Sequence, residues 1–167
     1  MIIEAPIKLI GNNGSPYTRK MVSLLRYKHI PYKIIWTDPE EYLDQHNIEK
    51  PKPVLHPTFL FENSDKKIIA VTDSTPIIRK LEKKFASRST IPSSPVLKFL
   101  NYLLEDYGDE WWTKFMFHYR WFDDKDIDNA GTLLPLYANS TLTNEELSQK
   151  KKKIANRQLG RVWVVGS

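Results

Sequence analysis

Residues 7–20 read Ile-Lys-Leu-Ile-Gly-Asn-Asn-Gly-Ser-Pro-Tyr-Thr-Arg-Lys, and this stretch decides the fold. The apolar run 7–10 predicts a strand, residues 11–14 predict a turn, and Ser15 followed by Pro16 has the pattern of a helix N-cap with proline at the first helical position. The start of a helix exposes unpaired N–H groups and partial positive charge, which favour an anion. Because the chain has no cysteine, that anion has to come from a ligand.

The first half of the chain predicts an α/β domain. Its expected elements are, in order, strand 7–10, helix 16–29, strand 31–36, strands 58–61 and 67–71, and helix 74–85. A helix between the first two strands makes a β-α-β unit with parallel strands. The polar residues 62–65 predict a hairpin between the next two strands. The stretch that joins residue 36 to residue 58 is expected to be irregular.

From about residue 93 the pattern is helical only. Apolar residues repeat at intervals of three, four and seven through residues 95–121, which predicts one long amphipathic helix with Gly108 in its interior. Thr143 and Glu146 form a plausible capping box for a further helix over 144–158. Residues 86–94 are rich in small polar side chains and are interpreted as a linker. The fold class is therefore α/β followed by all-α.

Composition narrows the class of protein. With 167 residues, 41% of them hydrophobic and 27% charged, the chain is ordinary globular material. No apolar run is long enough for a membrane span, and the beginning lacks the pattern of a signal peptide, so a soluble cytoplasmic protein without a membrane partner is expected. The absence of cysteine excludes disulfides and thiolate zinc sites, and the four histidines show no metal-ligand spacing. No metal is expected.

Two features near the end of the chain each leave an alternative. The net charge of +5 is densest at residues 150–153, which favour a solvated helix face over nucleic-acid binding because no aromatic residues interleave with the lysines. Residues 162–165 are strongly apolar, and Gly166-Ser167 looks like the cap of a helix whose body is absent. A truncated chain is expected, and a tail packed against the helices is the alternative.

Three local motifs, in this order and spacing, resemble the glutathione S-transferase superfamily. Residues 14–20, Gly-Ser-Pro-Tyr-Thr-Arg-Lys, are similar to the nucleophile-activating turn of its serine-type members. Residues 54–58, Val-Leu-His-Pro-Thr, stand where the family carries a cis-proline, and residues 73–78, Asp-Ser-Thr-Pro-Ile-Ile, are similar to its acidic-Ser motif. The resemblance covers residues 6–85 well and residues 95–160 loosely. It implies a thioredoxin-like glutathione-binding domain over 1–85, a linker over 86–94 and an incomplete helical domain over 95–167.

The resemblance implies that Ser15 is the catalytic residue, because its hydroxyl would donate a hydrogen bond to the thiolate of bound glutathione and lower the pKa of that thiol. A purely structural N-cap is the alternative role. Tyr17 and Thr18 compete with Ser15 for the activating role, and Tyr17 alone is more often a packing residue. Arg19 could reinforce an anion site, although an arginine there is more often a solvated surface residue.

The other two motifs imply binding roles. A cis bond at Pro57 would let the main chain of His56 pair with the cysteinyl part of the tripeptide, whereas a simple strand-entry proline is the alternative. The family has a small aliphatic residue in place of His56. Asp73, Ser74 and Thr75 open a helix and are expected to cap it, and the same groups could bind the γ-glutamyl carboxylate and ammonium.

Tyr107 and Trp111 belong to an aromatic stripe that is interpreted mainly as core, although the corresponding helix of the family lines the pocket for an apolar electrophile. The implied function is conjugation of glutathione, as co-substrate, to small electrophiles in detoxification, by a homodimer if the chain is full length. A non-catalytic glutathione-binding or protein-interaction module of the same fold is the alternative.

Overall fold

The computed structural model describes residues 1–165, so the predicted cap at Gly166 and Ser167 lies outside the described residues. The chain forms two compact units that divide between Thr90 and Ile91. The first is an α/β unit and the second is helical.

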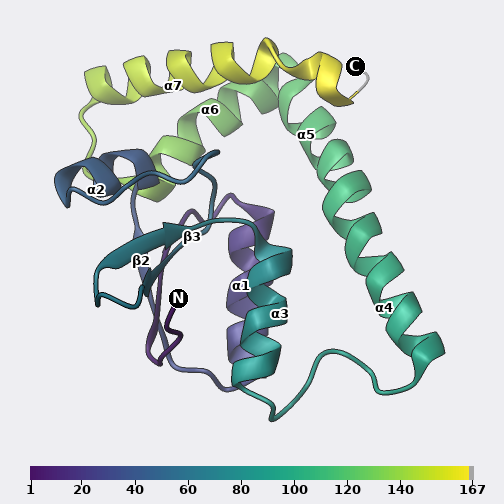
Figure 1. The fold of residues 1–167 in the computed structure, drawn as a ribbon. Helices are drawn as coiled ribbons and strands as arrows, with labels where there is room; N and C mark the ends of the chain where they lie inside the picture. The colour runs from purple at the N-terminus through teal and green to yellow at the C-terminus, as the bar shows by residue number, and fades with distance from the viewer. Residues whose placement is uncertain (166–167) are drawn as a thin grey trace. The chain divides into compact units, whose positions relative to one another are not determined.

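A four-stranded mixed sheet organises the first unit (Figure 1). β1 (Ile7–Gly11) and β2 (Tyr32–Trp36) pair in parallel, whereas β3 (Thr58–Glu62) pairs antiparallel with both β1 and β4 (Ile68–Val71). The spatial order is β2-β1-β3-β4. The helices are α1 (Pro16–Tyr27), α2 (Pro39–Gln45) and α3 (Ser74–Lys84). The predicted thioredoxin-like β-α-β and β-β-α order is confirmed.

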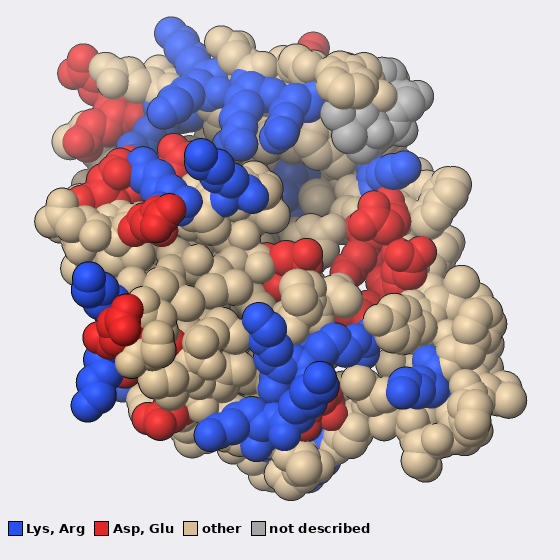
Figure 2. Space-filling model, viewed as in Figure 1, with Lys and Arg blue, Asp and Glu red and all other residues tan. Residues whose placement is uncertain are grey.

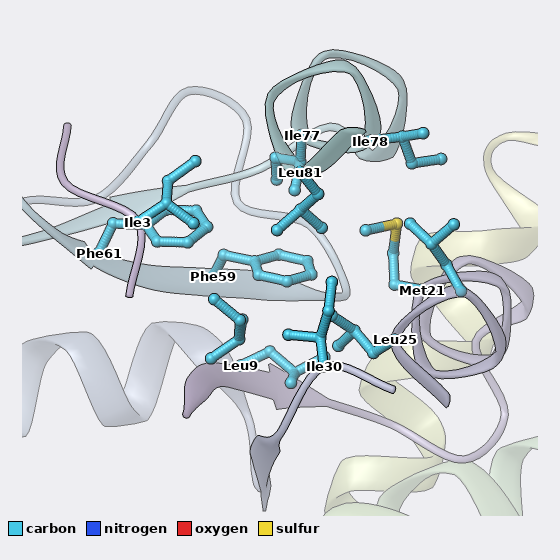
Figure 3. Packing of buried hydrophobic residues seen from close by; sticks show 12 residues of the cluster. Ile3, Leu9, Met21, Leu25, Ile30, Phe59, Phe61, Ile77, Ile78 and Leu81 are labelled. Carbon is cyan, nitrogen blue, oxygen red and sulfur yellow. The ribbon is translucent and has the colours of Figure 1, made fainter. Parts of the chain in front are cut away.

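Side chains that alternate along the strands fill two apolar layers. Leu9 and Phe59 are paired neighbours on β1 and β3 and lie in the larger layer, with Met21 and Leu25 of α1 and Leu81 of α3, as Figure 3 shows. The next residue along each strand points to the opposite face. There Ile10 and Leu60 pack with Leu43 of α2. Helices α1 and α3 therefore cover one face of the sheet and α2 covers the other.

Helix α2 corrects the prediction of an irregular connection between residues 36 and 58. Its seven residues are too few to display a clear helical period. A local signal was nevertheless present, because Asp38 caps the helix by accepting from the backbone N–H groups of Glu40 and Glu41, and Pro39 occupies the first helical position.

The second unit contains α4 (Pro95–Tyr107), the π-helix η1 (Gly108–Trp112), α5 (Thr113–Trp121), α6 (Asp124–Ala138), α7 (Asn144–Leu159) and the 3-10 helix η2 (Val162–Val165). Residues 95–121 are helical throughout, as predicted, but a π-helical segment interrupts the α-helical pattern at Gly108. The capping box of Thr143 and Glu146 is confirmed at the start of α7. Helix α6 was missed because Pro135 lies inside it, although its Asp123 cap and acidic first turn are favourable helix-start signals.

The aromatic stripe of the long helix is not core, which corrects the main interpretation from sequence. No residue of α4 is buried, and the exposed fractions of Tyr107 and Trp111 are 44% and 54%. Helical spacing shows only that side chains share a face, whereas burial requires another element to cover that face. In this unit α6 packs against α7 and α5 packs against α6.

Candidate functional site

Ser15 lies at the N-terminus of α1 and its hydroxyl has two partners. Its oxygen accepts a hydrogen bond from the backbone N–H of Thr18 at 3.2 Å, which makes Ser15 the N-cap, and its O–H donates to the backbone carbonyl of His56 at 3.4 Å. The first contact confirms the capping role. The second brings the turn after β1 against the segment before β3, which lies 41 residues away in sequence.

The turn before Ser15 is held from inside by Asn12 and Thr18. The Asn12 side chain accepts from the N–H of Gly14 at 2.8 Å, and the backbone N–H of Asn12 donates to the hydroxyl of Thr18 at 3.3 Å. Thr18 is only 1% exposed, and a Cβ at Gly11 would lie 2.7 Å from its methyl carbon. Thr18, one of the three predicted candidates for thiol activation, therefore braces the turn from within.

Tyr17 and Arg19 lie on the first turn of α1 and have different environments. Tyr17 is half-buried, whereas Arg19 is exposed. The Nε of Arg19 donates to the backbone carbonyl of Asn13 at 3.0 Å. This contact holds the guanidinium against the same turn that carries Ser15.

His56 and Pro57 form the segment that faces Ser15. The bond between them is cis, as predicted, and Pro57 is buried. Burial lowers the pKa of the His56 imidazole from its ordinary value, and the carboxylate of Asp38 opposes this only in part. The imidazole Nδ1 is buried with no hydrogen-bond partner among the described residues. His56 is therefore a neutral side chain near neutral pH.

Asp73, Ser74 and Thr75 open α3. Asp73 has a backbone φ of 78° and caps the helix by accepting from the N–H of Thr75 at 3.2 Å. Ser74 is 8% exposed and its hydroxyl accepts from the Nζ of Lys20 at 3.3 Å. Lys20 is on α1, five residues after Ser15, so this contact links α1 to the N-terminus of α3.

Lys20 was missed by sequence reasoning. A lysine on a helix is most often a solvated residue, and nothing local distinguishes Lys20 from Arg19 beside it. Its pairing with Ser74 joins residues 54 positions apart, which no local pattern reveals. The candidate site in the first unit therefore consists of the N-termini of α1 and α3, the hydroxyls of Ser15 and Ser74, and the ammonium of Lys20. This combination suits a ligand with anionic groups.

Tyr107 and Trp111 belong to the second unit, whereas all the other predicted site residues belong to the first. Trp111 lies in η1, and the Nζ of Lys114 sits 5.3 Å from the centroid of its ring.

Figure 2 shows lysine and arginine side chains gathered over α7, where the run 150–153 lies. Lys151 of this run pairs with the carboxylate of Asp128 on α6.

Among residues 1–165, no group of three or more His, Asp or Glu side chains is arranged to hold a metal ion. In the same part of the chain, no helix combines the length and apolar character needed to cross a membrane.

Comparison with protein families identifies the domain in the first unit. Residues 9–89 match the family model of the glutathione S-transferase N-terminal domain, which spans β1 to α3 and includes all three motifs. Residues 9–89 are a glutathione S-transferase N-terminal domain. No curated protein sequence matches the chain.

Solved glutathione S-transferases share its fold. A glutathione S-transferase from Rhodospirillum rubrum F11 is 16% identical, with a TM-score of 0.52, and the match covers 92% of this chain and 63% of that one. Glutathione transferase F2 from Populus trichocarpa is 15% identical, with a TM-score of 0.50, over 93% of this chain and 67% of the other. The chain thus spans about two thirds of the length of these two solved structures.

Proposed function

We propose that this chain binds reduced glutathione in its first unit and that Ser15 donates a hydrogen bond to the thiolate. The observation that carries the proposal is the position of the Ser15 hydroxyl at the N-terminus of α1, beside the His56 carbonyl. An O–H···O bond of 3.4 Å is longer than the usual 2.5–3.0 Å and is easily exchanged. A thiolate that takes the place of the carbonyl gains a hydrogen bond and the favourable end of the helix dipole, and both lower its pKa.

In this proposal, groups near Ser15 bind the remaining parts of the tripeptide. The main chain of His56, before Pro57, pairs with the cysteinyl part. The hydroxyls and N–H groups of Ser74 and Thr75 bind the γ-glutamyl carboxylate, and Asp73 pairs with its ammonium. Tyr17 and Arg19 border the thiol end. Lys20, which already contacts Ser74, adds a positive charge at the carboxylate end.

The activity that we propose is conjugation of glutathione to a small electrophile, with detoxification in the cytoplasm as its setting and a homodimer as its assembly. The glutathione-binding domain is residues 1–85, the linker 86–94 and the helical domain 95–167. Tyr107 and Trp111 contribute to the pocket for the electrophile. Proximity and the lowered thiol pKa supply the rate enhancement. A glutathione-binding module without turnover is the second candidate, because the residues of the first unit account for binding of glutathione but not for binding of an electrophile.

Calorimetric titration of the full chain with reduced glutathione tests binding. The expected result is saturable heat at millimolar ligand, weakened in Ser15→Ala. Ser94→Ala is the matched control, because Ser94 also precedes a proline at a helix start but makes no side-chain cap hydrogen bond. No heat with the unaltered chain refutes the proposal.

Conjugation to a model electrophile separates the two candidates. Turnover that is lost in Ser15→Ala and retained in Ser94→Ala supports a transferase. Binding without turnover by the unaltered chain supports the non-catalytic module.

A further inference from the structure

A buried ion pair lies in the first unit, outside the proposed glutathione site. Lys28 follows α1 directly, and its side chain is 0% exposed, whereas that of Glu82 on α3 is 8% exposed. The Nζ of Lys28 lies 3.0 Å from the Glu82 carboxylate. Buried charges are costly unless they are paired and hydrogen-bonded, so the remaining partners of these two groups matter.

The remaining partners all belong to residues 87–90, the last residues of the first unit. The ammonium of Lys28 also donates to the backbone carbonyls of Ser87 and Arg88, at 3.0 and 3.3 Å. The Glu82 carboxylate accepts from the Ser89 hydroxyl at 2.8 Å, from the Thr90 N–H at 3.2 Å and from the Thr90 hydroxyl at 2.9 Å. One ion pair thus holds four consecutive residues.

Arg88 adds an attachment at the end of α1. Its backbone has a φ of 52°, in the left-handed region. Its Nε donates to the carbonyl of Tyr27, and its guanidinium carbon lies 4.7 Å from the centroid of the Tyr27 ring. Such a cation–π contact at an exposed site is weak by itself.

Apolar contacts contribute little to holding residues 87–90 in place. Residues 86–90 form neither helix nor strand, and Ala86, Ser87, Arg88 and Ser89 are exposed. The apolar core of the first unit is built from other residues and does not include Lys28 or Glu82. The attachment therefore depends on charges and hydrogen bonds, and residues 86–90 contribute no side chain to the apolar core under the sheet.

We propose that Lys28 and Glu82 form a charge latch that holds residues 87–90 against the end of α1, and that loss of either charge releases this segment while the rest of the first unit stays folded. The latch fixes the point from which the chain leaves the first unit. Its opening is a local unfolding event, of the kind that proteolysis detects. The proposal does not depend on glutathione binding.

Limited digestion of the full chain with trypsin tests the latch, because Arg88 is itself a cleavage site. Glu82→Gln keeps the shape of the side chain but removes the charge. We expect cleavage after Arg88, followed by mass spectrometry, to become at least about tenfold faster than in the unaltered chain. Glu49→Gln, the same change at an exposed glutamate of the first unit, is the control and should leave the rate unchanged.

Cleavage after Lys83 and Lys84 provides an internal measure, since both residues lie on α3 one turn before the segment. If these sites open as fast as Arg88 in Glu82→Gln, the helix unfolds with the segment and the latch is refuted. An unchanged rate at Arg88 also refutes it.

If Glu82→Gln loses its circular dichroism signal altogether, Ser89→Ala combined with Thr90→Val decides the question. This variant removes side-chain hydrogen bonds from the segment and leaves the ion pair in place. Faster cleavage after Arg88 alone supports the latch, and an unchanged rate overturns it.

Discussion

The hydroxyl of Ser15 and the backbone carbonyl of His56 lie 3.4 Å apart, although 41 residues separate them in sequence. The contact joins the turn after β1 to the segment before β3, on two strands that are neighbours in the sheet. A serine that caps a helix and also touches the segment beside a cis-proline serves the fold and the proposed site at once.

Ser15→Ala is expected to lower the free energy of unfolding by about 1 kcal/mol, because the N–H of Thr18 loses its cap. Ser94→Ala should change it by less than about 0.5 kcal/mol, since the Ser94 side chain makes no cap hydrogen bond. Urea denaturation followed by circular dichroism measures both. Equal losses in the two variants would show that the Ser15 contact contributes nothing specific.

His56→Val should reduce the acid sensitivity of the fold. Burial holds the pKa of His56 below that of an unfolded histidine, so below about pH 6.5 the unfolded state binds the extra proton first. The stability from the neutral imidazole is present above that pH and is lost as the pH falls through it. Urea unfolding at about pH 7.5 and about pH 5.5 should show a smaller drop for His56→Val than for the unaltered chain. His46→Gln, at an exposed histidine, is the control and should keep the full drop.

Lys28→Met and Glu82→Gln should each destabilise the first unit by less than the roughly 3–5 kcal/mol that a permanently buried, unpaired charge costs, because release of residues 87–90 lets the remaining charge reach solvent. The double variant should cost clearly less than the sum of the two, since no uncompensated charge remains. Thermal and urea unfolding of all four proteins give the coupling energy. Strict additivity would mean that the two side chains do not act as a pair.

Gly11→Ala and Gly108→Ala should have opposite effects. A Cβ at Gly11 meets the Thr18 methyl at 2.7 Å and a methyl of Ile34 at 3.0 Å, which should cost about 1–3 kcal/mol. A Cβ at Gly108 has nothing within 4 Å, and alanine at this helical position should add roughly 0.5–1 kcal/mol. Denaturation midpoints compare the two, and a stabilising Gly11→Ala would contradict the packing described around Thr18.

Lys20→Met should weaken glutathione binding about fivefold to tenfold, if the γ-glutamyl carboxylate lies beside Ser74 as proposed. Lys33→Met, at an exposed lysine of β2, is the control for the change in net charge. Calorimetric titration of both variants checks the result. If Lys20→Met and Lys33→Met bind glutathione with equal affinity, Lys20 is not part of the binding site.

Local patterns predicted what local interactions determine. The apolar run of β1, the Ser15-Pro16 cap and the Thr143 capping box are readable from a few neighbouring residues, and the structure contains each of them. Helix α2 was missed because seven residues carry little periodicity, and α6 because an internal proline argues against a helix.

Long-range relationships were not readable in the same way. Lys20 pairs with Ser74, and Lys28 pairs with Glu82, in each case across 54 positions of sequence. In the sequence, both lysines look like ordinary surface residues. The exposure of Tyr107 and Trp111 likewise depends on whether another element covers their helix face. The sequence therefore indicates which residues could form the site, whereas the tertiary fold determines which of them meet.

The π-helical turn at Gly108–Trp112 divides the long helix into two halves that are out of phase. A π-turn closes its hydrogen bond over five residues instead of four, so it inserts one extra residue, equivalent to about 100° of rotation, into an α-helix. Aromatic residues of α4 and α5 that the 3.6-residue repeat would align along one line therefore point in different directions before and after the insertion. A partner helix that packed along the aromatic row of α4 would therefore not meet the aromatic residues of α5 in the same row.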